Sequence, residues 1–245
     1  MNRRKIFILF FLIIMNIHFV RGQNQSKAYD FPIKPGTKEW TNLKNNKQKV
    51  DICQIPNEQL KLLSTSELLE SCLNYPLLPD IFAFNNIQDG FEKFKMDFNG
   101  INELFVRNDI SNVLISMYKS LSPLDYNDNL SLIRKGEFSV NISLIEIFCS
   151  QHEVLIQLDF KEKQNLVSEL LNKYNKKSKS EIYGRLSFRT LAFCLANILQ
   201  SENFIASSSN DTITNEILMF ETKGGRITND IFSNIISLSK QFKNN

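Results

Sequence analysis

Residues Tyr75–Tyr118 read YPLLPDIFAFNNIQDGFEKFKMDFNGINELFVRNDISNVLISMY. This stretch is the most apolar and aromatic part of the chain after its first residues. Its apolar side chains come close to a spacing of three or four residues, which places them on one face of a helix. They are Ile81, Phe82, Phe84, Ile87, Phe91, Phe94 and Phe98. The stretch therefore predicts helical structure around which the rest of the core packs.

Four polar residues interrupt the apolar pattern: Asn85, Asn86, Gln88 and Asp89. Two interpretations are open: these side chains hydrogen-bond neighbouring helix ends within the core, or they contact a ligand. We prefer the structural interpretation, which predicts that replacing Asn85 or Asn86 by alanine lowers the melting temperature. Phe84→Ala is expected to do the same, because it removes core volume.

A carbohydrate-binding or hydrolytic site is the alternative for this polar cluster. Asn85 and Asp89 are four residues apart, as are Gln88 and Glu92, so each pair lines up along a helix. Glycosidic cleavage requires two carboxylates at a set separation, which one helix face does not provide. No catalytic residue is therefore assigned. The aromatic residues that would accompany a bound sugar are Tyr75, Phe84 and Phe91.

Residues 1–22 have the pattern of a secretory signal peptide. Arg3–Lys5 form a basic start, and Ile6–Met15 is an unbroken apolar run. This run is shorter than the roughly 20 residues of a permanent membrane helix. Val20 and Gly22 place small residues at the −3 and −1 positions of a cut before Gln23. We expect a secreted or periplasmic protein without a stable membrane span after cleavage, and an uncleaved anchor is the alternative.

Cleavage at this position changes the charge of the chain. It removes four of the 29 basic residues and leaves 25 against 26 acidic residues, a net charge of −1. The sequence pI of 8.6 is therefore no reason to expect binding to nucleic acid or to an anionic membrane surface.

Composition favours helices. The chain holds 8 glycines and 6 prolines, too few turn signals for a β-sandwich, which needs a turn about every 8–12 residues. We predict an all-α fold in which residues 37–245 form one domain of about eight packed short helices. An extended arm at residues 23–36 precedes it, because Pro32 and Pro35 keep their predecessors out of the α region. Residues 122–136, rich in Asp, Asn and Ser, are the candidate internal boundary.

Three helix starts are marked by capping residues. Thr37 predicts an N-cap, with Trp40 one turn into the helix. Ser64 with Glu67, and Asp159–Glu162, have the spacing of capping boxes, in which the two side chains each bind a free backbone N–H. Asp80 is a candidate cap for the helix of the central stretch.

Four cysteines in an exported protein allow three disulfide pairings. Cys53 and Cys72 end successive predicted helices and are the first candidate disulfide pair. Cys149 with Cys194 is the second candidate pair. The leading alternative is that the cysteines are free, buried thiols. Cys149 and His152 are three residues apart on one predicted helix. No orienting partner or oxyanion loop accompanies them, so we expect no nucleophilic catalysis by this pair.

No sequence pattern indicates cofactor chemistry. The chain has no CxxC, HxH or HExxH for zinc and no glycine-rich loop for a phosphate group. The acidic run Asp125–Asn129 lacks the glycine and the closing glutamate of a calcium loop. We therefore expect no metal, cofactor, nucleotide or nucleic acid. The lysines between Lys173 and Lys179 are expected at a solvated helix end.

Two sequence motifs indicate a relationship to other proteins: YDFPIKPGTKEW at Tyr29–Trp40 and IFAFNNIQDG at Ile81–Gly90. Together with CQIP at Cys53–Pro56 and YPL at Tyr75–Leu77, they resemble a group of uncharacterised secreted helical proteins of Gram-negative bacteria. The resemblance covers residues 29–105. It implies export and brings no known activity.

These observations favour a non-catalytic exported protein that binds a protein partner in the cell envelope or outside the cell. The alternative is a hydrolase or carbohydrate-binding protein that uses the polar residues near Asn85–Glu92. A small-ligand carrier is a third option, and it would need a sizeable cavity lined by phenylalanine.

Overall fold

The computed structural model describes residues 28–124, 131–206 and 211–245. All regular structure in these ranges is helical, in thirteen α-helices and one 3-10 helix, which confirms the predicted all-α class. The helices are shorter and more numerous than the sequence suggests. The predicted signal peptide and the first residues of the arm lie outside the described ranges. Within those ranges, no helix is long and apolar enough to cross a membrane.

Contacts between residues divide the chain into two compact units. Unit 1 is the described part of Met1–Phe84 together with Gly90–Arg107, and unit 2 is Asn85–Asp89 with the described part of Asn108–Asn245. The candidate boundary at residues 122–136 stays a prediction, and residues 125–130 of it lie outside the described ranges.

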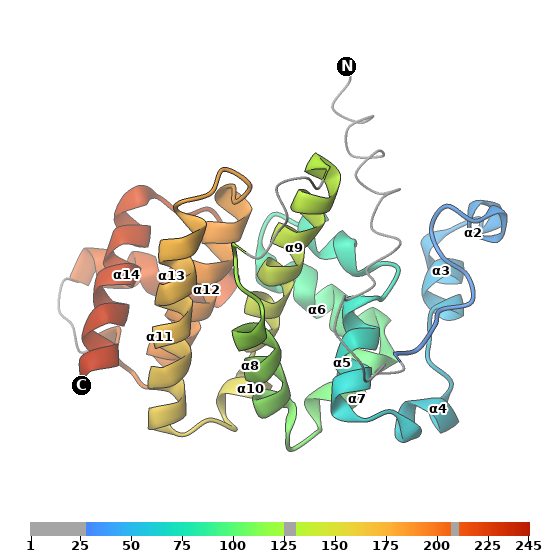
Figure 1. Cartoon of the computed structure of the whole chain (residues 1–245), viewed down its shortest axis with the longest axis horizontal. Helices are drawn as coiled ribbons and strands as arrows, with labels where there is room; N and C mark the ends of the chain where they lie inside the picture. Colours follow the sequence, from blue (N-terminus) through green and yellow to red (C-terminus); the bar gives the residue numbers. More distant parts are fainter. Residues whose placement is uncertain (1–27, 125–130, 207–210) are drawn as a thin grey trace. The chain divides into compact units, whose positions relative to one another are not determined.

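Unit 1 contains short helices, coloured blue to green in Figure 1. The division passes through α6, whose residues from Gly90 onward belong to unit 1. The elements are α2 (Lys38–Asn42), α3 (Asn46–Ile52), α4 (Asn57–Leu62), α5 (Thr65–Leu73), the 3-10 helix η1 (Leu78–Ala83), α6 (Ile87–Asp97) and α7 (Asn99–Phe105).

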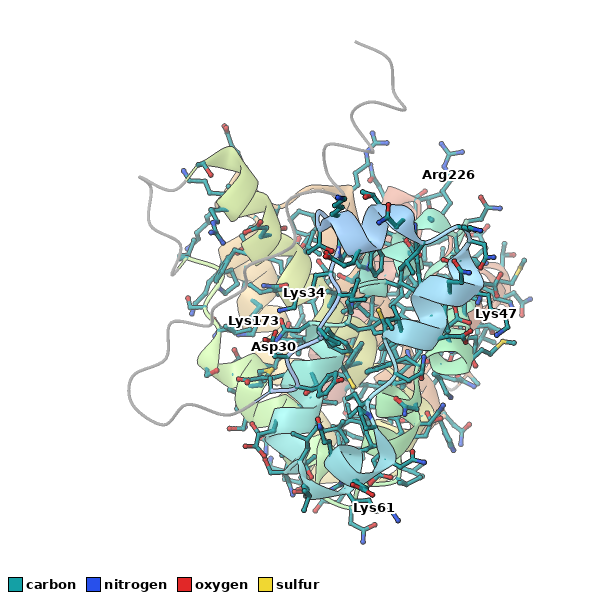
Figure 2. All side chains as sticks on the ribbon, turned by 90° about the vertical axis from the view of Figure 1, so that its right-hand side faces the viewer. Asp30, Lys34, Lys47, Lys61, Lys173 and Arg226 are labelled. Atoms are coloured by element: carbon teal, nitrogen blue, oxygen red, sulfur yellow. The ribbon has the colours of Figure 1, made fainter. Side chains whose placement is uncertain are left out.

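The described part of the arm runs across unit 1 without helical structure. Phe31 is buried, and its ring centroid lies 6.0 Å from those of Tyr75 and Phe98. Asp30 and Lys34 form an ion pair beside it (Figure 2). The arm thus contributes one aromatic side chain to the core of this unit.

Aromatic rings fill that core. Tyr75 stacks on Phe98 with centroids 4.2 Å apart, and Phe94 lies 5.4 Å from Tyr75 and 5.7 Å from Phe98. Phe91 is also fully buried, so the predicted aromatic face of this helix is confirmed. Phe84 is 39% exposed, and the prediction that it fills the core is wrong.

Two amide side chains fix the end of α6. Gln54 Nε2 donates to the Asp97 carbonyl (2.7 Å), and Gln54 Oε1 accepts the N–H of Asn99 (3.0 Å). The Asn99 side chain in turn accepts from the N–H of Ile55 and donates to its carbonyl, at 3.1 and 2.7 Å. The two bonds of Gln54 satisfy backbone groups at the end of α6 and the start of α7, and the two bonds of Asn99 satisfy the backbone of Ile55 between α3 and α4.

Gly90 permits close approach of α6 to η1. A Cβ at this position would lie 2.2 Å from the carbonyl oxygen of Ile81, a separation that real Cβ atoms do not adopt. Only glycine therefore fits, and the contact sets the spacing of two walls of the cavity described below.

Unit 2 is built around α12, which packs against α9, α11, α13 and α14 (Figure 1). Residues 191–196 of α12 are all buried, as expected for a helix that is apolar on every side. Helices α8 and α10 pack on α9. The bounds are α8 (Ile110–Ser120), α9 (Leu132–Cys149), α10 (His152–Leu155), α11 (Phe160–Lys177), α12 (Arg185–Ser201), α13 (Asp211–Lys223) and α14 (Asn229–Asn244).

The predicted capping residues occupy the expected positions. The Thr37 side chain accepts the N–H of Trp40 at the start of α2. Ser64 with Glu67, and Asp159 with Glu162, form complete capping boxes at the starts of α5 and α11. The three predicted helix starts are confirmed.

Candidate functional site

A cavity of about 320 Å³ lies in unit 1 between α3, η1 and α6. This volume is at the lower end of the range of about 300–1,000 Å³ that is typical of small-molecule sites. Apolar and aromatic side chains make most of its wall, with a few polar groups among them. The lining residues are Asn46, Tyr75, Leu77, Asp80, Ile81, Ala83, Phe84, Gly90, Lys93, Phe94 and Asp97.

The hydroxyl group of Tyr75 is the most unusual feature of this wall. Tyr75 is 3% exposed, and its Oη has no hydrogen-bond partner among the described residues. Packing against Phe94 and Phe98 holds the ring, so the hydroxyl cannot swing out to water. An unpaired buried hydroxyl costs about 1–3 kcal/mol, and native structures rarely keep one that neither water nor a ligand satisfies.

Asp80 contributes a carboxylate to the same cavity. It lies in the first turn of η1, but that helix starts without a side-chain cap, so the predicted capping role of Asp80 is wrong. Within the described ranges, no residue donates a hydrogen bond to this carboxylate. Burial raises the pKa of Asp80 and the charge of Asp97 adds to the effect, while Lys49 and Lys93 oppose it. The carboxylate is therefore partly desolvated.

Tyr75 and Asp80 are close enough to interact electrostatically. Burial is the main cause of the raised pKa of the Tyr75 hydroxyl, and the nearby ionisable groups of Cys53, Asp97 and Asp80 raise it further. The cavity wall therefore combines a tyrosine whose hydroxyl is shielded from water with a carboxylate that is partly exposed.

The second carboxylate of the cavity is already paired. Lys93 and Asp97 are four residues apart on α6, and Lys93 Nζ donates to both carboxylate oxygens of Asp97. At the rim, Phe84 is partly exposed and Asn46 presents a side-chain amide. Apolar contact and polar contact are thus both available to an occupant.

The predicted polar cluster lies elsewhere, at the start of α6. Asn86 Oδ1 accepts the N–H of Asp89 (2.8 Å), and Asn86 Nδ2 donates to the Asp89 carboxylate (2.7 Å). Lys223 also donates to this carboxylate, at 2.9 Å. The bonds from Lys223 and then Asn86 lower the pKa of Asp89. Asn86 and Asp89 therefore cap the helix and pair within unit 2.

The other predicted residues do not form a site together. Asn85 and Glu92 are exposed, so the prediction that Asn85 is buried is wrong. Gln88 Nε2 donates to Gln151 Oε1 at 3.2 Å, also within unit 2. None of the four residues Asn85, Asn86, Gln88 and Asp89 is among those lining the cavity. Ligand contact by these residues stays a prediction.

The cysteines are four free, buried thiols, and the candidate Cys53–Cys72 bridge is absent from this structure. Burial raises the pKa of Cys53 to about 12 and that of Cys72 well above its usual value, so both are neutral. Cys149 ends α9 and is buried, whereas His152 begins α10 and is exposed. The two residues do not share one helix, contrary to the sequence prediction.

Unit 2 holds a second group of buried polar side chains, centred on Glu146 of α9. Glu146 and Lys177 are both 0% exposed and form an ion pair at 2.6 Å. The hydroxyl of Tyr118 donates to Glu146 Oε1 (2.8 Å), and that of Thr190 donates to Oε2 (2.7 Å). Lys177 also donates to the carbonyl of Ser187 (3.1 Å). Every member of this cluster therefore has a partner.

Two lysines of α11 are buried, contrary to the prediction that they lie at a solvated helix end. Lys173 is buried, pairs with Glu169 at 3.0 Å and lies 4.5 Å from the centre of the Tyr118 ring. Lys177 is buried as described. Burial lowers the pKa of both lysines, and their glutamate partners oppose this shift. The prediction of a solvated basic helix end is wrong for these two residues.

Tyr75 and Phe84, the predicted aromatic partners of a bound sugar, both line the cavity. Lys93 and Asp97 were not predicted as site residues, and Asp80 was predicted as a helix cap. One signal is available: Asp80 is a charged residue within the apolar run LLPDIF. A charge at such a position indicates either a cap or a site, and only the three-dimensional structure decides between them.

The described residues contain no group of three or more His, Cys, Asp or Glu side chains placed to hold a metal ion. Comparisons of the chain with known protein families, with characterised proteins and with solved structures found no match. The chemistry of the cavity is therefore the basis for a functional proposal.

Proposed function

We propose that the protein is an exported, non-catalytic binding protein whose unit 1 cavity receives a group of its partner in the cell envelope or outside the cell. The observation that carries the proposal is the cavity of about 320 Å³, whose mostly apolar wall includes the Asp80 carboxylate and the Lys93–Asp97 ion pair. An apolar wall with a few convergent polar groups is the usual composition of a ligand site.

Binding accounts for the carboxylates of the cavity better than catalysis does. Glycoside hydrolysis uses two carboxyl groups, one as acid and one as base or nucleophile. Lys93 occupies both oxygens of Asp97, which leaves Asp80 as the one carboxylate in the cavity wall without a hydrogen bond from a described residue. One observation favours the hydrolase alternative, the raised pKa of Asp80, which suits a general acid.

A cavity-filling variant tests the proposal. Ala83→Trp places a large side chain on an exposed position of the cavity wall, and Asn112→Trp on the exposed side of α8 is the matched control. Each protein is immobilised and exposed to envelope and culture-fluid fractions of the producing cells. We expect a partner that the unchanged protein and Asn112→Trp retain and Ala83→Trp does not. Equal retention by both variants contradicts binding through this cavity.

Export is tested on the same cells. If residues 1–22 are a cleaved signal, mass spectrometry of the exported pool finds a protein that begins at Gln23. Intact Met1 in a membrane fraction supports the anchor alternative. Full-length protein confined to the cytoplasm contradicts export altogether.

A further inference from the structure

We infer that residues 36–52, which carry α2 and α3 (blue in Figure 1), form a lid over the unit 1 cavity that opens while the rest of the unit stays folded, and that the attraction between Lys49 and Asp80 holds it closed. The role of the lid, which is to admit a group of the partner, rests on the proposed function. The motion itself is a property of the fold and has its own test.

Two of the three walls of the cavity, η1 and α6, are fixed to each other. Gly90 of α6 lies against the carbonyl group of Ile81 in η1, with no room for a Cβ between them. Behind them, Phe94 of α6 and Tyr75 are both buried, and their ring centroids are 5.4 Å apart. A change in the width of the cavity therefore has to come from the third wall, α3.

Helix α3 is held much less firmly than these two walls. None of its seven residues is buried, whereas α5 buries six of its nine. In the whole lid, Trp40 is the one buried side chain, and Lys49 Nζ of the same segment lies 5.3 Å from the centre of its ring. Segments with few buried apolar contacts open at a lower cost in free energy than global unfolding.

The hydrogen bonds of the lid also stay within it. The N–H of Lys44 donates to Gln48 Oε1 (2.7 Å), and Lys47 pairs with Asp51 (2.7 Å). Within the described ranges, no hydrogen bond or ion pair joins residues 38–49 to a part of unit 1 outside the lid. Opening therefore breaks few specific contacts.

Gly36, at the start of the lid, suits a hinge. Its φ is +91°, a left-handed conformation that glycine adopts without strain, and nothing lies within 4 Å of the position of a Cβ. Phe31 and Pro35, just before it, are buried. The chain thus changes at Gly36 from an anchored arm to an exposed segment.

The other end of the lid is attached at Gln54. Its Nε2 donates to the carbonyl groups of Val50 and Asp97, at 2.7 Å each, which ties the last turn of α3 to the end of α6. Asn46, the α3 residue that lines the cavity, begins the helix, about 9 Å from its end at 1.5 Å per residue. A rotation of α3 about Gln54 therefore moves Asn46 farthest and widens the cavity on that side.

Lys49 supplies an attraction between the lid and the fixed walls. It lies on α3, whereas Asp80 lies in η1. Burial raises the pKa of Asp80, and Lys49 is the largest of the charges that oppose this shift. Asp97 is paired with Lys93 on its own helix, so its charge is balanced within one wall. Within the described ranges Lys49 and Asp80 form no direct ion pair, so their attraction is weak enough to permit opening.

Hydrogen exchange of the unchanged full chain, measured by mass spectrometry, tests the motion first. We expect the amides of α3 to exchange about a hundredfold faster than those of α5. Protection of α3 equal to that of α5 overturns the lid.

A cysteine in the cavity wall then reports whether the cavity is uncovered. Leu77 lines the cavity and is 6% exposed, and Leu68 of α5 is buried outside it, so Leu77→Cys and Leu68→Cys are matched variants. Fluorescein-5-maleimide is a bulky reagent that needs an open cavity to reach residue 77. We expect it to label Leu77→Cys about a hundredfold faster than Leu68→Cys. Peptide mass spectrometry separates both sites from the four buried native thiols.

The closing attraction is tested in the Leu77→Cys protein. Lys49→Met should raise the labelling rate about threefold, because it removes an attraction between partly exposed charges. Lys38→Met, which replaces an exposed lysine of α2, is the control and should leave the rate unchanged.

The remaining outcomes are decisive as well. Equal labelling of the two cysteine variants, whether slow or fast, overturns the lid, because slow labelling shows no opening and fast labelling shows opening of the whole unit. A rate that Lys49→Met leaves unchanged overturns the role of Lys49. Exchange and labelling need no partner, so partner capture with Ala83→Trp decides the proposed function separately.

Discussion

Tyr118 in unit 2 and Tyr75 in unit 1 are buried to nearly the same degree, at 1% and 3% exposure, but their hydroxyl groups differ. The Tyr118 hydroxyl donates to Glu146, whose carboxylate is also bound by Lys177 and Thr190. The Tyr75 hydroxyl has no partner among the described residues, although a carboxylate lies nearby. One network is complete within the protein, and the other is not.

This difference separates a satisfied polar network from an unsatisfied polar group. A complete buried network satisfies every member, so nothing is left for a ligand and the network serves the fold. An incomplete one leaves a desolvated group unpaired, which costs free energy of folding. Burial and a shifted pKa occur in both places and do not distinguish them; the presence of partners does.

The largest expected effect on stability comes from removing one member of the hydrogen-bonded network around Glu146. Lys177→Met leaves the Glu146 carboxylate buried without its counter-charge, and we expect the free energy of unfolding to fall by about 3–5 kcal/mol. Lys176→Met, one residue earlier and half-buried, is the control. Urea unfolding measures both. A double variant, Lys177→Met with Glu146→Leu, should recover much of the loss, because no unpaired charge remains. A small loss for Lys177→Met alone would mean that the pair contributes little.

The next effect compares the two tyrosines directly. Tyr118→Phe leaves an oxygen of Glu146 with one bond fewer, and we expect a loss of about 1–3 kcal/mol of unfolding free energy. Tyr75→Phe removes a hydroxyl that has no partner, so stability should stay within about 0.5 kcal/mol or rise. Thermal and urea unfolding of the two variants provide the comparison. Equal losses would show that the Tyr75 hydroxyl already has a partner within the protein.

A smaller effect concerns the two asparagines before α6. Asn86→Ala removes the side chain that caps this helix and should lower the free energy of unfolding by about 1 kcal/mol. Asn85 is exposed, so Asn85→Ala should change it by less than about 0.5 kcal/mol. Differential scanning calorimetry of both variants measures the difference. Similar losses would restore the original interpretation, in which both amides support the core.

The smallest effect is a dependence on pH at Asp80, which faces Lys49, Lys93, Asp97 and Tyr75. Its folded-state pKa is raised, so the folded protein keeps a proton that the unfolded chain has already lost. Stability therefore falls as pH rises from about 4, the unfolded value, through the folded pKa. Asp80→Asn should be slightly more stable than the unchanged protein at neutral pH, and this gain should vanish below about pH 4. A gain that does not depend on pH would contradict the assignment.

Capping boxes and helical spacing were predictable because the interacting residues are close in sequence. Ser64 and Glu67 are three residues apart, and their bonds form as soon as the first turn does. Phe91, Phe94 and Phe98 follow helical spacing within one continuous segment and are buried. Phe84 fails the same rule because it precedes α6, and the helical period does not extend across residues 84–86.

The buried lysines and the cavity were not predictable in this way. Lys177 has the local pattern of a solvated lysine near a helix end, but its partner Glu146 lies 31 residues earlier on another helix. Asp80 has the local pattern of a cap, and only the folded chain places it in a cavity wall with Lys93 and Asp97 of α6. Both errors arise from pairings between separate segments.

By itself, the sequence determined that this protein is helical, where several helices begin and which aromatic residues of α6 face the core, because caps and periodicity act within one or two turns. Only the tertiary structure decided which polar groups are satisfied. Glu146 gains its partners from three other segments, and the cavity wall combines Asn46, Asp80 and Asp97 from three elements. Desolvation and hydrogen-bond pairing depend on what the folded chain places around a group, and that information is not local.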